Sequence, residues 1–105
     1  MTNDIQTQLE QSPLALLYFS SIGCSACSAL KPKLEGLILS DFPLVKFVEI
    51  ETSTNRELAA QHSVFTVPSA LLMTEGKEAQ RFVRNFGLLE VKSTLDRLYP
   101  MVYGE

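Results

Sequence analysis

The chain has 105 residues, of which 46% are hydrophobic and 20% are charged. This length and composition suit one domain with a single buried core and exclude a disordered or a fibrous chain. The longest uninterrupted apolar run covers only residues 14–19, whereas a membrane-spanning helix needs roughly 20 apolar residues. We therefore expect a single domain over residues 1–105, with no membrane as a partner.

Nine Lys and Arg against twelve Asp and Glu give a net charge of -3. The chain has no clustered basic face of the kind that binds phosphate backbones, so nucleic acid is not expected as a partner. The first eleven residues contain no Lys or Arg and so lack the basic start of a secretory signal. We expect a monomeric protein in the cytoplasm.

The N-terminal segment predicts a helix followed by a strand. Ile5 and Leu9 are four residues apart in a polar stretch that Asn3 or Asp4 can cap, which predicts a short amphipathic helix. The apolar run 14–19 follows a proline and predicts a strand buried on both faces, in the centre of a sheet.

A second helix and a second strand follow. Leucine and isoleucine recur on one face from residue 30 to residue 38, which predicts a helix over 25–39 with a bend at Pro32. Residues 44–50 are rich in Val, Ile and Phe and predict the second strand. Two strands joined through a helix make a right-handed crossover.

The C-terminal half predicts a short helix over 54–62. Strands over 69–74 and 79–84 follow, joined by a turn at 75–77. A closing helix begins at residue 88 and ends before Pro100. The two strands should be antiparallel neighbours. The order of elements predicts an α/β protein with a mixed central sheet and helices on both faces.

Two cysteines, Cys24 and Cys27, stand between the first strand and the second helix. Residues three apart on a helix bring their Cβ atoms within about 5–6 Å, a separation compatible with a disulfide after a modest adjustment. Cys24 falls at or before the first turn, where free N–H groups and the helix dipole stabilise a thiolate. We expect Cys24 to attack a partner's disulfide and Cys27, one turn deeper, to release the reduced partner.

The cysteine pair has two alternative roles, a structural disulfide and a zinc site. A structural disulfide would close a loop of only four residues, a gain of about 2 kcal/mol, and the cytoplasm would tend to reduce it. A zinc site usually needs four ligands, and the chain offers Cys24, Cys27 and the distant His62, so the metal would have to be shared between subunits. No metal is expected, and His62 is expected to cap helix 54–62 as a cation.

The sequence around the cysteines resembles thioredoxin from the first strand to the last helix. The resemblance rests on YFSSIGCSACSALKPKLEGL, followed by FVEIE, FTVPSALL, EGK and NFG. Pro32 matches the proline that bends the active-site helix of the family, Val67 and Pro68 match the residue and the cis-proline that face the cysteines, and Gly87 matches a glycine on the same surface. The resemblance implies a thioredoxin-like, three-layer α/β/α fold with a mixed central sheet.

The resemblance also implies a function. It identifies a thiol-disulfide oxidoreductase that exchanges a Cys24–Cys27 dithiol or disulfide with protein disulfides and thiols and is recycled by a reductase or a small thiol. No cofactor is implied, because the redox equivalents sit in the protein's own sulfurs. Around the cysteines, the implied substrate-binding surface consists of Gly23, Thr66, Val67, Pro68 and Gly87, with the Val67 backbone pairing with an extended partner segment.

The residues next to the cysteines depart from the family pattern. Gly23 replaces the usual Trp, and Ser25 and Ala26 replace Gly-Pro between the cysteines. In the family, the residues between the cysteines tune the stability of the thiolate. The sequence therefore leaves the reduction potential open.

A second departure lies beneath the helix. The family's buried aspartate, which helps to deprotonate the resolving cysteine, falls on Tyr18, and its lysine partner falls on Phe47. A phenol with a pKa near 10 is a poor base, although its hydroxyl could hold a water. Glu49 and Glu51 are either substitutes for the acid or solvated side chains. We expect slow release of the mixed disulfide, and the alternative function is a thioredoxin-like protein-binding module with slow or no redox turnover.

Overall fold

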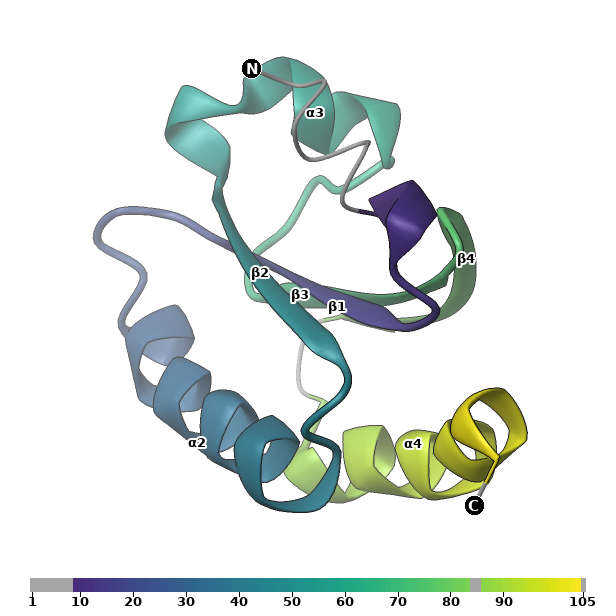
Figure 1. Ribbon diagram of the computed structural model, residues 1–105. Helices are drawn as coiled ribbons and strands as arrows, with labels where there is room; N and C mark the ends of the chain where they lie inside the picture. The colour runs from purple at the N-terminus through teal and green to yellow at the C-terminus, as the bar shows by residue number, and fades with distance from the viewer. Residues whose placement is uncertain (1–8, 84–85, 105) are drawn as a thin grey trace.

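The computed structural model describes residues 9–83 and 86–104, which form one sheet with helices on both faces (Figure 1). The expected helix at Ile5 and its cap at Asn3 or Asp4 lie outside the described residues, and residues 9–11 are helical. The elements in chain order are β1 (Ala15–Ser20), α2 (Ser25–Asp41), β2 (Lys46–Glu51), the 3-10 helix η1 (Thr52–Thr54), α3 (Arg56–Gln61), β3 (Ser69–Thr74), β4 (Lys77–Val83) and α4 (Leu88–Tyr103).

The strand order in the sheet is β2-β1-β3-β4. β1 runs parallel to β2 and antiparallel to β3, and β3 runs antiparallel to β4. Every residue of β1 is buried, which follows from an apolar strand flanked on both sides by other strands. The central position predicted for this strand is confirmed, with its bounds one residue later along the chain.

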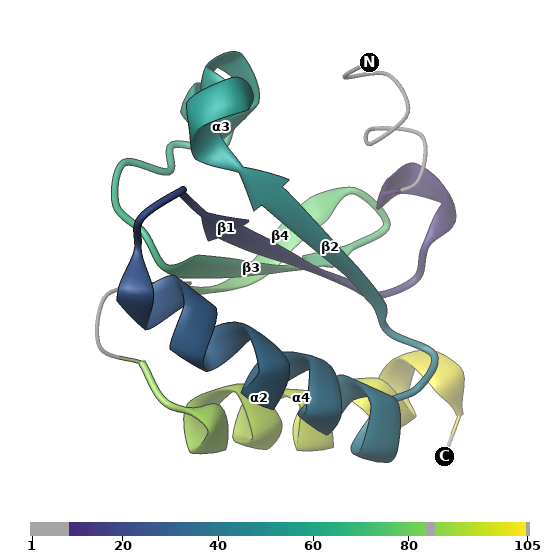
Figure 2. The same ribbon diagram turned by 90° about the vertical axis from the view of Figure 1, so that its left-hand side faces the viewer.

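Two cores lie on the two faces of the sheet, because successive side chains of β1 point in opposite directions. Leu16 and Tyr18 face α2 and α4, where they join Leu34 and Leu95 in one cluster. Leu17 and Phe19 face α3 and belong to the other cluster. Figure 2 shows α2 and α4 on one side of the sheet and α3 on the other. The three-layer α/β/α fold is confirmed.

The short helix predicted over 54–62 is divided in the structure. Asn55 separates η1 from α3 with a φ of -135° and a ψ of 49°, neither helical nor extended, and its side-chain amide donates to the Glu51 carbonyl at 2.9 Å. His62 is the C-cap residue, and its backbone N–H donates to the Leu58 and Ala59 carbonyls. Burial lowers the pKa of the His62 ring, whose centroid lies 6.1 Å from that of Phe19. His62 thus caps the helix through its backbone N–H, and burial disfavours the cationic form expected of its side chain.

The closing helix continues beyond its predicted end and contains Pro100. Its last turn is held by two tyrosines against the loop before β2. The Tyr99 hydroxyl accepts from the Leu44 N–H at 3.1 Å, and the Tyr103 hydroxyl donates to the Leu44 carbonyl at 3.1 Å. Gly104 then ends the helix in the left-handed conformation, with a φ of 73°. The helix thus continues through Pro100 although the proline supplies no backbone donor.

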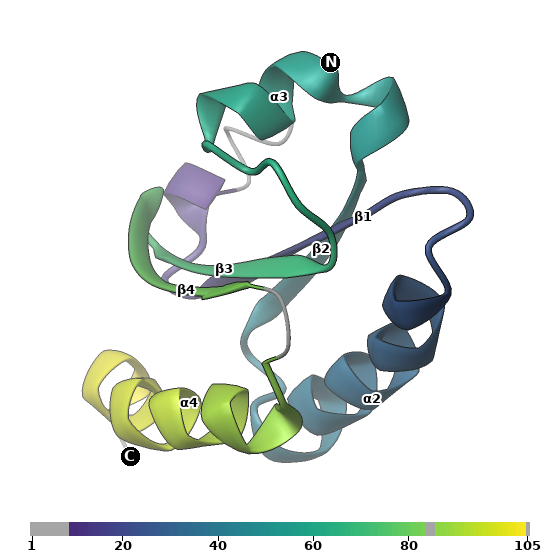
Figure 3. The same ribbon diagram turned by 180° about the vertical axis from the view of Figure 1, so that it is seen from behind.

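Several loops meet at one end of the strands of the sheet. The carboxyl ends of the parallel strands β1 and β2 lie there together with the start of β3, because Phe19 pairs with both Ile50 and Ser69. Figure 3 shows the segment between α3 and β3 reaching the sheet on the side where α2 begins. In the part of the chain that the structure describes, no helix is long and apolar enough to cross a membrane.

Candidate active site

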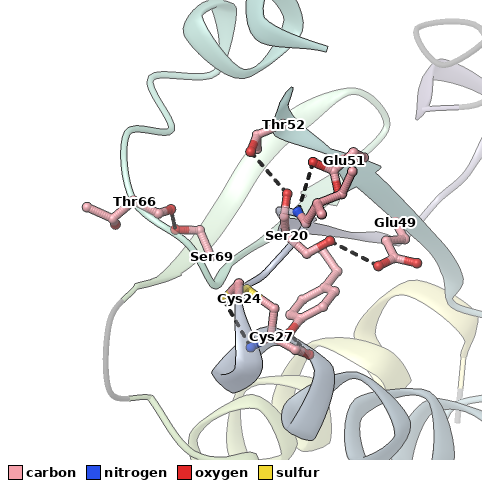
Figure 4. Close-up of a disulfide and its surroundings, with 10 residues drawn as sticks. Ser20, Cys24, Cys27, Glu49, Glu51, Thr52, Thr66 and Ser69 are labelled. Atoms are coloured by element: carbon pink, nitrogen blue, oxygen red, sulfur yellow. Dashed lines mark hydrogen bonds between the residues drawn. A yellow bond between two sulfur atoms is a disulfide. The ribbon is translucent and has the colours of Figure 1, made fainter. Parts of the chain in front are cut away.

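Cys24 and Cys27 form a disulfide at the start of α2 (Figure 4), with their Cα atoms 5.3 Å apart. Cys24 is the N-cap residue, in an extended conformation, and its Sγ accepts from the Cys27 N–H at 3.2 Å. Cys24 is half-buried, whereas Cys27 is only 3% exposed. The sulfur of Cys24 is therefore the more accessible one, and it sits where helix N–H groups favour an anion.

The loop before Cys24 is fixed from two sides. Gly23 has a φ of +85°, which a residue with a side chain rarely adopts, so glycine suits this position. The Cys24 N–H donates to the Ser21 carbonyl at 3.1 Å. The Ile22 N–H donates to a carboxylate oxygen of Glu51 at 3.2 Å, and this bond ties the loop to the end of β2.

A groove runs between α2 and the loop that leads into β3. The Val67–Pro68 peptide bond in this loop is cis. The groove has a volume of about 430 Å³ and is lined by Ala26, Ala29, Leu30, Lys33, Val67, Pro68 and Phe86. Its lining is mostly apolar, and it includes Ala26, which lies between the two cysteines in the sequence.

The residues of the expected substrate surface do not all line one groove. Val67 and Pro68 line the groove beside α2, and Thr66 and Val67 line a second hollow against α3. Gly23 lies with Cys27 in a third, polar hollow. Gly87 is the exposed N-cap residue of α4 and follows Phe86, which lines the groove.

Sequence reasoning missed the α2 side of the groove. Ala26, Ala29, Leu30 and Lys33 line it, and their spacings of three, four and seven residues place them on one face of a helix. The buried residues of α2, Cys27, Leu34 and Ile38, lie on the adjacent face, and Leu30, four residues before Leu34, stands at the boundary between the two faces. The same periodicity that identified the core face could have identified this second face.

Tyr18 lies beneath the first turn of α2. Its side chain is fully buried, and its hydroxyl donates to the Cys27 carbonyl at 2.7 Å. Its ring stacks on Phe47, with centroids 6.0 Å apart. Burial, with a smaller contribution from Glu49, raises the pKa of Tyr18 to about 12. The hydroxyl therefore stays protonated and donates to the helix backbone.

Glu49 and Glu51 both form hydrogen bonds with neighbouring residues and are not merely solvated. Glu49 makes an ion pair with Lys31, with Nζ and Oε1 2.7 Å apart, and accepts from the Ser20 hydroxyl at 3.0 Å. The bond from Lys31 lowers the pKa of Glu49, and bonds from Ser53 lower the pKa of Glu51. The lowered pKa makes each carboxylate a weaker base, less suited to take a proton from a thiol.

Within residues 9–83 and 86–104, no group of three or more His, Cys, Asp or Glu side chains is placed to hold a metal ion.

A family model described as Thioredoxin matches residues 2–97 of the chain. The chain belongs to the thioredoxin family. Membership and a cysteine pair that forms a disulfide together support thiol-disulfide oxidoreductase chemistry in general.

Individual relatives agree with this assignment of the thioredoxin family. The Thioredoxin-like protein YdfQ of Bacillus subtilis is 34% identical over 101 residues, which cover 96% of this chain and 89% of that protein. A thioredoxin of Chlamydia trachomatis is 33% identical over 72 residues, 69% of this chain and 70% of that protein. The solved structure of thioredoxin 1 from Thermosipho africanus is 32% identical and superposes with a TM-score of 0.76, covering 87% of this chain and 99% of that one.

Proposed function

We propose that this chain exchanges its Cys24–Cys27 dithiol or disulfide with the disulfides and thiols of other proteins. The observation that carries the proposal is the placement of Cys24. Cys24 is half-buried, and its sulfur caps α2 and accepts from the Cys27 N–H at 3.2 Å, two residues before Ala26, which lines the groove. A sulfur so placed is stabilised as a thiolate and can be reached by a partner.

The proposed reaction has two exchanges. The Cys24 thiolate attacks one sulfur of the partner's disulfide, so a mixed disulfide forms and the other partner sulfur leaves as a thiolate. The Cys27 thiolate then attacks the Cys24 sulfur, and the partner leaves with both sulfurs reduced. The two electrons come from the Cys24–Cys27 pair, which ends as a disulfide and needs a reductase or a small thiol to return it to the dithiol. No cofactor takes part.

We propose that the partner lies in the groove between α2 and Pro68. An extended segment there would pair with the backbone of Val67, as one strand adds to another. Gly23, Thr66 and Gly87 would complete the surface around the sulfurs. Main-chain bonds would supply much of the affinity, so partners of different sequence could be accepted. We further propose that a single domain over residues 1–105 carries this activity, in the cytoplasm.

Cysteine variants test the proposal in a dithiothreitol-coupled insulin reduction assay. Cys24→Ser removes the attacking sulfur, and Cys27→Ser removes the resolving one, so we expect both variants to lose turnover. Only Cys27→Ser should accumulate disulfide-linked partners, because it keeps the first step and lacks the second. Turnover by Cys24→Ser at the wild-type rate would contradict the assignment of the nucleophile. Partners trapped by Cys27→Ser would identify the substrates directly.

A second candidate function is a thioredoxin-like binding module whose redox turnover is slow or absent. It is favoured by the poor match of the titratable groups that the described residues place near Cys27, since burial raises the pKa of Tyr18 to about 12 and the bond from Lys31 lowers the pKa of Glu49. The titration of Cys24 distinguishes the two functions. An oxidoreductase requires a thiolate that forms well below the free-thiol pKa of about 8.5, and a binding module does not.

A further inference from the structure

A polar hollow of about 350 Å³ lies beside Cys27, on β1, β2 and the first turns of α2. Cys27 and Lys31 both line it, four residues apart on α2, so their side chains lie on the same face of the helix one turn apart. Glu49 enters from β2 and makes the ion pair with Lys31, with Nζ and Oε1 2.7 Å apart. The resolving sulfur and the ion pair thus share one hollow.

Other titratable groups lie in or beside this hollow. Glu51 also lines it from β2, and its carboxylate accepts from Ile22 and Ser53. Tyr18 of β1 does not line the hollow but bonds to the Cys27 carbonyl, and it remains neutral because burial raises its pKa to about 12. Among the described residues that line the hollow, Lys31 is the one cation. Cys27 therefore shares the hollow with one positive charge, which is paired with Glu49 and also feels the charge of Glu35 on α2.

We propose that the Lys31–Glu49 ion pair controls how readily Cys27 forms the thiolate that resolves the mixed disulfide. This inference rests on the function proposed above. Neither residue attacks the sulfurs, and both act on Cys27 through its electrostatic surroundings. Lys31 favours the Cys27 thiolate. Glu49 opposes formation of the Cys27 thiolate in two ways. Its negative charge repels the thiolate, and its ion pair holds the Lys31 ammonium at β2.

The need for such control follows from the chemistry of the second step. In the mixed disulfide Cys27 carries a proton, which must pass to water in the hollow before the sulfur can attack Cys24. The new Cys24–Cys27 bond forms as the bond from Cys24 to the partner breaks, and the partner leaves as a thiolate. A sulfur that is only 3% exposed pays a desolvation cost to become an anion. A nearby cation offsets that cost.

Two single substitutions give effects of opposite sign. Lys31→Met keeps the aliphatic stem and removes the cation, so the pKa of the Cys27 thiol rises and resolution slows. Glu49→Gln keeps the shape of the side chain and can still accept from the Ser20 hydroxyl, but it releases Lys31, so the same pKa falls and resolution accelerates. If the ion pair were only structural, both substitutions would change the rate in the same direction.

The expected change in the rate of resolution follows from the change in the pKa of the Cys27 thiol. A pKa change of about one unit alters the thiolate fraction roughly tenfold at pH values below the pKa. The nucleophilicity of a thiolate falls with its pKa and offsets about half of this change on a logarithmic scale. We therefore expect resolution to change about threefold in each variant, down for Lys31→Met and up for Glu49→Gln.

Reduced protein mixed with dithiobisnitrobenzoate in a stopped-flow instrument separates the two exchanges. Attack by Cys24 releases the first thionitrobenzoate, and attack by Cys27 on the mixed disulfide releases the second. The second phase is followed from about pH 5 to about pH 9, which spans the range where protein thiols titrate. Its inflection should move to higher pH in Lys31→Met and to lower pH in Glu49→Gln.

An ion pair elsewhere in the chain provides the matched control. Lys92 and Asp96 form an exposed pair on α4, with Nζ and Oδ2 2.9 Å apart. Lys92→Met and Asp96→Asn should leave the second phase unchanged. A shift of the same sign in Lys31→Met and Glu49→Gln, or no shift in either, would overturn the inference. A wild-type protein that releases a single thionitrobenzoate would instead refute the proposed function.

Discussion

Tyr18 holds the first turn of α2 through one buried hydrogen bond. Its hydroxyl donates to the Cys27 carbonyl at 2.7 Å, and its ring packs in the core between the sheet and the helices. Because burial keeps the phenol protonated, this bond persists across the neutral pH range. Because Tyr18 keeps its proton at neutral pH, its role is to position the resolving cysteine, Cys27.

Tyr18→Phe should lower the free energy of unfolding by about 1 kcal/mol, the net value of a typical intramolecular hydrogen bond. Denaturant unfolding of the oxidised protein measures this loss. Tyr103→Phe is the control, because the Tyr103 hydroxyl donates to the Leu44 carbonyl at an exposed site where water can replace it. Equal losses in the two variants would contradict a special role for the buried bond.

At the scale of the elements, α2 presents different faces to different surroundings. Leu34 and Ile38 are buried against the sheet and α4, whereas Leu39 is 75% exposed. A third face, which includes Ala26 and Leu30, lines the groove beside Pro68. The helix therefore supports the disulfide with its buried face and forms the wall of the groove with another.

Leu34→Ala should destabilise the protein by about 2–5 kcal/mol, because it leaves a cavity at a fully buried position. Leu39→Ala should change the stability by less than about 0.5 kcal/mol, because the side chain is already exposed to water. Thermal or denaturant unfolding compares the two variants on the same helix. Similar losses for both would mean that α2 does not pack as described.

At the scale of the whole molecule, several groups hold protons less tightly in the folded state than they do in water. Burial lowers the pKa of His62 below 6.5, and the bond from Arg81 lowers the pKa of Glu78 below 4.5. Glu49 and Glu51 are lowered below 4.5 as well. Since the unfolded chain binds more protons at acid pH, stability must fall as the pH is lowered.

The loss should occur in two windows. Above pH 6.5 the His62 contribution is complete, and it declines as the pH falls from 6.5 through the folded pKa. The carboxylate contribution is complete above pH 4.5 and declines below it. Denaturation midpoints measured across both windows test this. His62→Gln should abolish the upper window and leave the lower one, and a stability that rises on acidification would contradict the assignment.

The sequence alone determined the order of the elements, the central place of β1 and the position of Cys24 at a helix start. These features follow from local patterns, namely a continuous apolar run, leucines at helical spacing and a cysteine pair at the boundary. The helix end at Pro100 could not be predicted, because contacts of Tyr99 and Tyr103 with Leu44, far away in the chain, stabilise the last turn.

Only the tertiary structure decided what surrounds the two sulfurs. The β1–β3 register pairs Phe19 with Ser69, and this brings the loop at Pro68 to the edge of the sheet where Cys24 begins its helix. The same packing joins Lys31 of α2 to Glu49 of β2 beside Cys27. The composition gave a net charge of -3 and two cysteines. Electrostatic control depends on distances between residues remote in sequence, and such distances are set only when the sheet and helices pack.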